Sequence, residues 1–190
     1  MSERTNAELA VLSLLAEQPR HGYEIEAVIE ARGMRQWTEI GFSSIYYLLK
    51  KLDKAGLIEG RMVEAGRGPA RKVYHVTPQG AAALRAGVID ALSVPRRCYP
   101  PIQLGLANLP GLSTGEAVDA LGAYRARLAQ HLAQAQGNRA RQQPLPYFVE
   151  AMFDYSVAMI RAELEWVEGF IARLIASADQ GSNKEETRRE

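Results

Sequence analysis

Several features that mark other classes of protein are scarce in this sequence of 190 residues. Cys98 is the only cysteine, which excludes a disulfide bond within the chain and predicts a reducing compartment, the cytoplasm. No apolar run reaches the roughly 18 residues of a membrane span. The N-terminus MSERTNAELAVL also lacks a basic segment followed by an apolar one, so we expect neither membrane insertion nor secretion.

A strong net charge is also absent from the chain as a whole. There are 23 Lys and Arg against 22 Asp and Glu, which gives a formal net charge of +1. The charges are unevenly distributed, because residues 1–42 carry four Arg and seven Glu, whereas residues 43–75 carry seven Lys or Arg and three Asp or Glu. Positive charge therefore gathers around the stretch GFSSIYYLLKKLDKAGLI, residues 41–58.

Patterns typical of enzymes and metal sites are missing. The stretch Gly41-x-Ser43 lacks the second glycine of a nucleophile elbow, and the glycines of 66–68 lack the third glycine of a dinucleotide site. The three histidines are dispersed and have no Cys, Asp or Glu at ligand spacing. We therefore expect no enzymatic activity, no metal and no cofactor.

Apolar residues at helical spacing predict two short helices near the N-terminus. The first lies in residues 7–19 and ends at Pro19. The second begins at His21, ends at Gly33 and carries a set of apolar positions at helical spacing, Tyr23, Ile25, Val28 and Ile29.

A third helix is predicted from Ser43, a good N-cap, to Gly56. Its core face consists of Ile45, Leu48, Leu49 and Leu52, spaced i, i+3, i+4 and i+7. The opposite face is rich in hydroxyl and ammonium groups, which suit phosphate oxygens, and a helix of this width enters a DNA major groove. We predict DNA contacts from Ser43, Ser44, Tyr46, Tyr47, Lys50, Lys51 and Lys54.

The period then changes to that of strands. Residues 57–63 and 71–77 are rich in β-branched and aromatic side chains, and they flank a Gly- and Pro-containing turn at 64–70. Arg67 and Arg71, at or beside this turn, are further predicted DNA contacts. Thr77 and Pro78 open a fourth helix, 78–92. Three helices, a hairpin and a helix are the order of a winged helix-turn-helix, which we assign to residues 1–92.

The second half is predicted to be a linker followed by a helical domain. Prolines punctuate residues 93–112, the predicted linker, whose middle can hold a turn or two of helix. Ser113 and Glu116 form a predicted capping box that opens one long helix, and a second begins at Tyr147. The apolar stripe of the second helix is too long for one partner helix to cover. The predicted fold is therefore mainly α with a small β-hairpin wing, a helical dimerisation domain at 113–176 and a disordered tail at 177–190.

The motifs HGYEI at 21–25, SSIYYLLKKLDKAGLI at 43–58 and RKVYHVTPQGAAAL at 71–84 resemble the PadR family of bacterial transcriptional regulators. The resemblance covers residues 7–92. It implies a cytoplasmic homodimeric repressor that binds a palindromic double-stranded DNA operator and responds to a small-molecule effector. The dimer interface expected from the C-terminal stripes comprises Leu121, Leu128, Leu164, Val167, Phe170, Ile171 and Leu174.

Two questions stay open at the level of sequence. An effector is expected near the junction of the domains or at the dimer interface, where the nearest aromatic or soft side chains are Trp37, Cys98, Tyr99 and Trp166. Winged helices also serve as protein-docking modules, with a basic face that meets an acidic partner. The spread of positive charge over both the third helix and the wing favours DNA.

Overall fold

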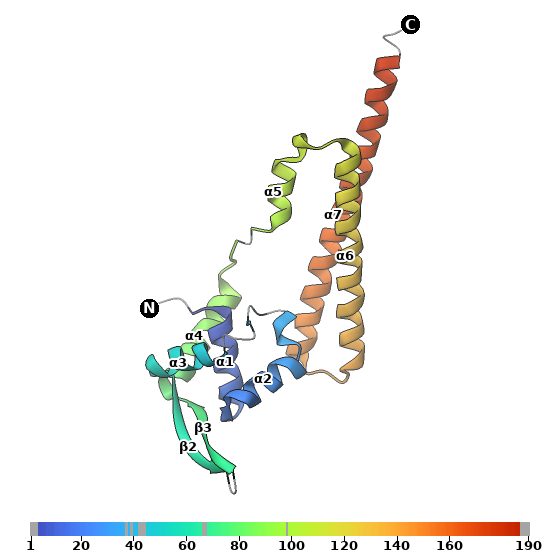
Figure 1. Ribbon diagram of the computed structural model, residues 1–190. Coiled ribbons are helices and arrows are strands. Elements are labelled where there is room, and N and C mark those ends of the chain that lie inside the picture. The colour runs from blue at the N-terminus through green and yellow to red at the C-terminus, as the bar shows by residue number, and fades with distance from the viewer. Residues whose placement is uncertain are drawn as a thin grey trace. The chain divides into compact units, whose positions relative to one another are not determined.

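A computed structural model describes residues 4–36, 38, 40–41, 45–65, 68–97 and 99–186. The chain divides into two compact units, Met1–Arg97 and Cys98–Glu190. The first holds α1 (Asn6–Glu17), β1 (Arg20–His21), α2 (Gly22–Ala31), the 3-10 helix η1 (Met34–Gln36), α3 (Ile45–Lys54), β2 (Ile58–Ala65), β3 (Gly68–Val76) and α4 (Pro78–Ser93). The second holds α5 (Pro101–Ala107), the 3-10 helix η2 (Leu109–Gly111), α6 (Thr114–Arg141) and α7 (Tyr147–Glu186) (Figure 1).

The predicted order of helices and hairpin in the first unit is confirmed, and local caps explain the boundaries. The hydroxyl of Thr5 accepts a hydrogen bond from the Glu8 amide, and the Glu8 carboxylate accepts one from the Thr5 amide, which closes a capping box on α1. His21 caps α2 in the same way together with Glu24. Gly56 ends the α3 turn with φ +69°, a conformation that favours glycine.

Thr77 joins α4 to the corner between α3 and β2. Its hydroxyl accepts from the Gly80 amide at 3.0 Å, as predicted for an N-cap, and donates to the Gly56 carbonyl oxygen at 2.7 Å. Gly80 allows this close approach, because a Cβ there would lie 1.9 Å from the Leu57 carbonyl oxygen.

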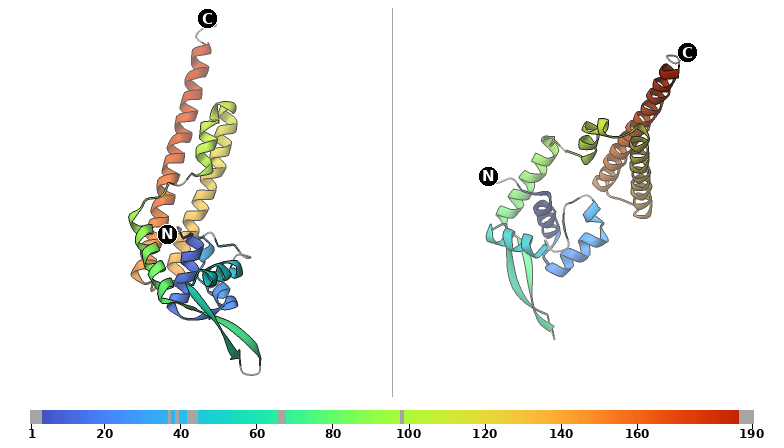
Figure 2. Two further views of the ribbon diagram at one scale, coloured as in Figure 1. Left: turned by 90° about the vertical axis from the view of Figure 1, so that its left-hand side faces the viewer. Right: turned by 45° about the horizontal axis from the view of Figure 1, so that its top comes forward.

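The sheet contains one strand that the sequence pattern did not predict. Its order is β1-β3-β2, all antiparallel, with Arg20 opposite Tyr74 and His21 opposite Val73. In the β2–β3 hairpin the pairing continues to Ala65 and Gly68, so most of the predicted turn 64–70 is strand. The hairpin projects from the helices as a wing (Figures 1 and 2).

One apolar core unites the first unit. It is built from α1, α2, α3, the start of β2 and the segment around η1, with Val11, Leu12, Ile25, Ile29, Ile45, Leu49 and Leu52 at 0% exposure. The four predicted core positions of α3 are all buried. In α2, Ile25 and Ile29 are buried as well, but Tyr23 is 75% exposed, so its assignment to the apolar face was wrong.

The second unit is dominated by α6 packed along α7 (Figure 2). The predicted capping box of Ser113 and Glu116 opens α6. The segment 93–112, predicted as a linker, contains α5 and η2. The sequence pattern favoured a disordered tail from residue 177, whereas α7 continues to Glu186. Among the described residues, no helix is both long and apolar enough to cross a membrane.

Candidate nucleic-acid interface

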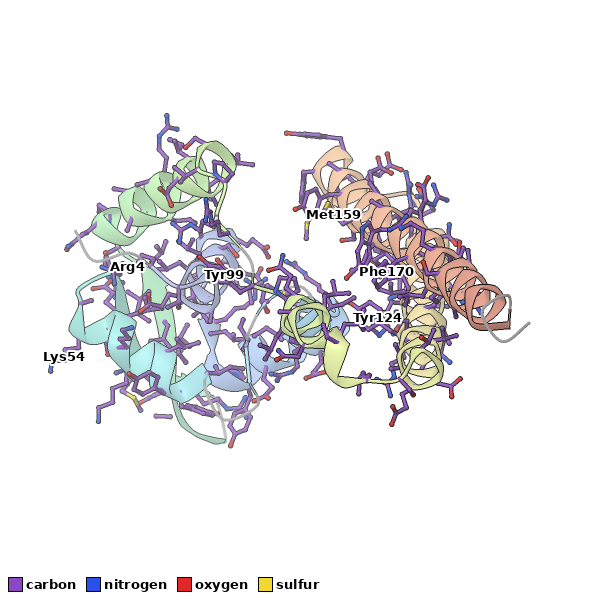
Figure 3. The ribbon with its side chains drawn as sticks, turned by 90° about the horizontal axis from the view of Figure 1, so that it is seen from above. Arg4, Lys54, Tyr99, Tyr124, Met159 and Phe170 are labelled. Carbon is purple, nitrogen blue, oxygen red and sulfur yellow. The ribbon has the colours of Figure 1, made fainter. Side chains whose placement is uncertain are left out.

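The recognition face of α3, as we call Tyr46, Tyr47, Lys50 and Lys54, lies on the solvent side of this helix. Tyr46 is 52% and Tyr47 66% exposed, and both lysines are exposed. Lys54 projects outward at the end of α3 (Figure 3). The buried residues of α3 lie on the other side, which fixes the rotation of the helix and therefore the direction of these donors.

Tyr46 rests against the N-terminal end of α2. Its ring meets that of Tyr23 edge to face at 6.2 Å between centroids, and Tyr23 meets His21 likewise at 6.3 Å. Gly22 makes room for Tyr46, since a Cβ on Gly22 would lie 2.7 Å from Tyr46 Cε1. Partial desolvation, followed by the proximity of Tyr23, raises the pKa of Tyr46. A tyrosine hydroxyl is protonated at neutral pH even at its ordinary pKa of about 10, so the Tyr46 hydroxyl can donate a hydrogen bond.

Lys51 differs from its neighbours on α3, because its ammonium is engaged by α1. Lys51 Nζ lies 2.7 Å from Oε1 of Glu8, whose side chain is only 1% exposed. Burial alone would raise the pKa of Glu8, but the hydrogen bonds from Lys51 and the Thr5 amide outweigh it, so the pKa is lowered. The sequence pattern grouped Lys51 with the DNA contacts, whereas in the structure Lys51 holds α3 to α1.

The wing adds cations along β2 and β3. Arg71 is exposed, and its Nη1 lies 3.4 Å from His21 Nε2. Lys72 pairs with Asp53 of α3 at 2.8 Å and lies over the Tyr74 ring, which ties the wing to α3. Arg61 is exposed and paired with Glu59. Arg71 is therefore the predicted wing contact whose position the structure gives.

Three predicted DNA contacts, Ser43, Ser44 and Arg67, lie outside the described residues. The structure also adds His21 and Tyr23 to the surface beside Tyr46. In the sequence, the motif HGYE was the signal for this surface. A histidine that caps a helix places the residues after it in the first helical turn, where their side chains remain accessible. Grouping Tyr23 with Ile25 and Ile29 was the mistake, because residues two and six positions apart lie on different sides of a helix.

The predicted dimer-interface residues form a core between α6 and α7 of a single chain. Leu121, Leu128 and Val167 are buried there, at 7%, 7% and 0% exposure, and Leu164, Phe170, Ile171 and Leu174 pack against them (Figure 3). Tyr124 donates to Glu163 at 2.5 Å across the same pair of helices, and desolvation, together with this hydrogen bond, raises the pKa of Tyr124 to about 12. Within one chain α6 therefore covers this side of α7, and a role of these residues in a dimer interface stays a prediction.

The structure describes two of the four predicted effector residues, Tyr99 and Trp166. Trp37 and Cys98 lie outside the described residues. Tyr99 is 79% exposed, and Trp166, at 42%, stacks on Phe170 with 5.2 Å between ring centroids. Within the described ranges, no group of three or more His, Cys, Asp or Glu side chains could hold a metal ion.

A helix that presents hydroxyls and amines opposite its buried side, beside a basic two-stranded wing, defines a winged-helix DNA-binding protein. The sequence profile of the Transcriptional regulator PadR-like family matches residues 11–86. The chain belongs to this PadR-like family of transcriptional regulators. An uncharacterised protein of Lysinibacillus sphaericus is 31% identical over 81 residues, which are 43% of this chain and 73% of that relative.

Solved structures share the fold over most of the chain. Bacillus subtilis PadR in complex with operator DNA has a TM-score of 0.73 at 23% identity and covers 88% of this chain and 98% of its own. The same protein in complex with p-coumaric acid gives 0.72 at 22%, with 88% and 97% covered. The Vibrio cholerae virulence activator AphA gives 0.71 at 18%, with 90% and 98% covered. At these identities the likeness establishes the fold.

Proposed function

We propose that the chain is a homodimeric, sequence-specific repressor that binds a palindromic operator in the cytoplasm and is released by a small-molecule effector. The observation that carries the DNA-binding part is the recognition face, with Tyr46, Tyr47 and Lys50 exposed opposite the buried side of α3. Their donors suit a major groove, and Arg71 on the wing suits the adjacent backbone. The fold shared with Bacillus subtilis PadR, solved on operator DNA, supports duplex DNA as the partner.

Dimerisation is proposed through the side of α7 that α6 leaves uncovered. Large apolar side chains are exposed along it, namely Phe148, Met152, Tyr155, Met159 and Trp166 at 57%, 38%, 69%, 55% and 42%. Such a stripe is costly to leave in water, and a second copy of the same helix offers a matching surface. A two-fold dimer matches a palindromic operator, whose half-sites lie about 34 Å apart, one turn of DNA.

A small-molecule effector is supported by the complex of the structurally similar PadR with p-coumaric acid. For this chain, Trp37, Cys98, Tyr99 and Trp166 remain predicted effector contacts. A repressor requires that DNA affinity fall when the effector binds, and linkage then requires that DNA weaken effector binding by the same factor.

Fluorescence anisotropy with labelled DNA from the chain's own upstream region, beside a shuffled fragment, tests the DNA-binding part across a salt series. We expect tight binding to the native fragment only, weakening steeply with salt. The double variant Lys50→Gln/Arg71→Gln should lose affinity and show a flatter salt dependence. Arg85→Gln, the loss of one exposed charge on α4 away from the recognition face and the wing, should behave like the parent.

The outcomes separate DNA reading from protein docking. If the double variant binds DNA as well as the parent does, the basic surface has another partner, and the docking alternative replaces ours. If both fragments bind equally and weakly, phosphate attraction alone accounts for binding, and sequence-specific reading is refuted.

A further inference from the structure

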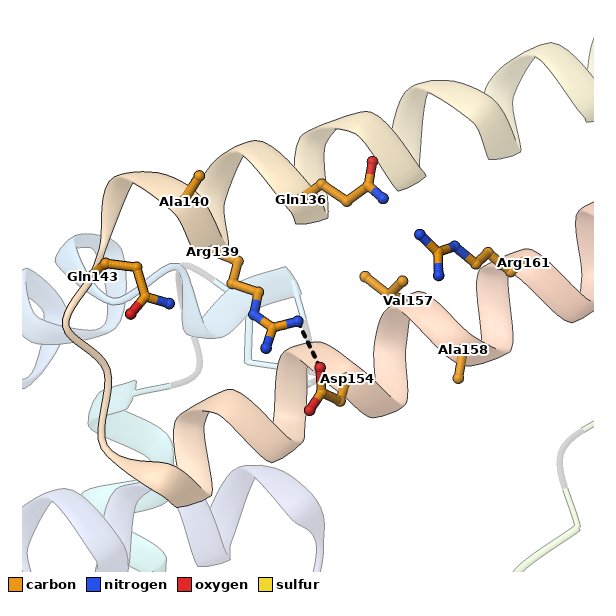
Figure 4. Close-up of a pocket in the computed structure, with 8 residues that line it drawn as sticks. All are labelled: Gln136, Arg139, Ala140, Gln143, Asp154, Val157, Ala158 and Arg161. Atoms are coloured by element: carbon orange, nitrogen blue, oxygen red, sulfur yellow. Dashed lines mark hydrogen bonds and ion pairs between the residues drawn. The ribbon is translucent and has the colours of Figure 1, made fainter.

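A pocket of about 390 Å³ opens between α6 and α7, close to the turn that joins them (Figure 4). Its walls are Gln136, Arg139 and Ala140 from α6 and Asp154, Val157 and Arg161 from α7. This volume is within the range of small-molecule sites, roughly 300–1,000 Å³. All of these residues belong to the second unit, so the pocket needs no residue from the first.

One of the two arginines that line the pocket has no ion-pair partner among the described residues. Arg139 lies 2.6 Å from Asp154 and 4.0 Å from Glu150, and Gln143 also donates to Glu150 at 3.3 Å. The two nearby carboxylates are therefore engaged by Arg139 and Gln143. Arg161, whose guanidinium projects toward the space beside Val157 in Figure 4, has no hydrogen bond or ion pair with any described residue. An unpaired guanidinium in a pocket is a binding group for an anion.

The floor of the pocket, between the two helices, is the apolar side chain of Val157, which is only 8% exposed. Ala140 and Ala158 lie at the edges of the pocket, and Figure 4 shows their methyl groups turned away from the space between the helices. Arg161 would pair with the carboxylate of a ligand, and the apolar floor favours a ligand that also has an apolar part. A phosphate or sulfate ion has no apolar part to contact the floor.

The pocket lies on a different side of α7 from the exposed apolar stripe. Asp154, Val157 and Arg161 recur at helical spacing, and so do Met152, Tyr155 and Met159, but at about 100° per residue the two sets point about 160° apart. A second copy packed on the stripe would therefore leave the pocket open.

We propose that this α6–α7 pocket binds a small organic carboxylate, which pairs with Arg161 while its apolar part lies on Val157. The planar guanidinium can hold both carboxylate oxygens, and the Gln136 amide offers a further donor. Arg139 keeps its place through Asp154 and shapes the wall. Carboxylate binding stands independently of DNA; the role of the pocket as an effector site rests on the proposed function.

The first experiment titrates the full-length protein, without DNA, with benzoate and hexanoate, and with benzamide and hexanamide as neutral counterparts, observed by NMR. Both carboxylates should bind saturably and the amides about tenfold or more weakly, because a charge-assisted pair is lost. Arg161→Gln should weaken carboxylate binding by a similar factor, Arg161→Lys less, and Arg125→Gln, an exposed α6 arginine outside the pocket, not at all. Unchanged thermal unfolding of the variants confirms that they fold.

The proposal is overturned if neither carboxylate saturates the protein, or if Arg161→Gln binds benzoate as tightly as the parent. A second arm adds benzoate to the complex with operator DNA. Release from the parent but not from Arg161→Gln supports the effector role. Binding of benzoate with no effect on DNA refutes that role while the carboxylate site stands, and failure of the parent to bind DNA refutes only the proposed function.

Discussion

Replacing Lys50 by Gln should flatten the salt dependence of DNA binding, whereas replacing its neighbour Lys51 by Gln should leave that slope unchanged. Lys50 is exposed on the recognition face and has no ion pair with any described residue. Lys51 Nζ is held 2.7 Å from the buried Glu8 carboxylate. Only an ammonium that faces the duplex displaces counterions from phosphates on binding.

The size of the effect follows from how many phosphates the variant no longer neutralises. Each neutralised phosphate contributes about 0.9 to the slope of log affinity against log salt concentration. A dimer carries the substitution twice, so Lys50→Gln should reduce the slope by about 1.8, and over a fourfold rise in salt the parent should lose roughly tenfold more affinity than the variant. Lys51→Gln should instead lower the urea midpoint of unfolding, because it leaves Glu8 buried without its cation.

The assay is anisotropy on one operator fragment at several salt concentrations, with urea unfolding of the same preparations. The double variant Glu8→Gln/Lys51→Gln provides the control, since it removes the unpaired buried charge and should recover part of the stability. The reasoning fails if Lys51→Gln flattens the salt slope as much as Lys50→Gln and leaves the unfolding midpoint unchanged.

Three further changes probe other parts of the fold. Thr77→Val removes both the cap on α4 and the bond to the Gly56 carbonyl, so the free energy of unfolding should fall by about 1–3 kcal/mol, with Thr77→Ser near the parent value by chemical denaturation. Met159→Asp should yield monomers in sedimentation while far-UV circular dichroism stays unchanged; dimers would refute the α7 interface. Because folding lowers the pKa of Glu8, its contribution to stability is present above its ordinary pKa of 4.5 and is lost as pH falls below it, so Glu8→Gln should show a weaker loss of stability in acid.

The elements that local patterns specify were predictable. The α3 helix shows its buried residues at i, i+3, i+4 and i+7, and Gly56, Thr77 and the Ser113–Glu116 box mark boundaries by their own hydrogen bonds or backbone angle. Such signals act within a few residues, so one sequence contains them in full.

Features that depend on distant partners were not predictable. β1 is only two residues long, and its strand character comes from pairing with β3, more than fifty positions away. Lys51 looks like Lys50 in sequence until α1 places Glu8 beside it. Tyr23 is a different case, because at about 100° per residue it points about 160° away from Ile25, so the spacing itself places it on the solvent side of α2, where it is exposed.

The apolar surface of α7 shows most clearly how a tertiary partner divides what a sequence presents as one stripe. Leu164 and Val167 pack with α6, while Met152 and Met159 remain exposed, although all four are apolar residues of the same helix. A polar third side carries Arg161 and the pocket. In the arrangement we propose, one helix holds its own chain together, meets a second copy and lines a ligand site on different sides. A ligand that shifts α6 against α7 would then move the exposed stripe, although the ligand itself lies on another side of α7. In the proposed dimer, such a movement of the stripe is what an effector needs to alter the spacing of the two recognition faces.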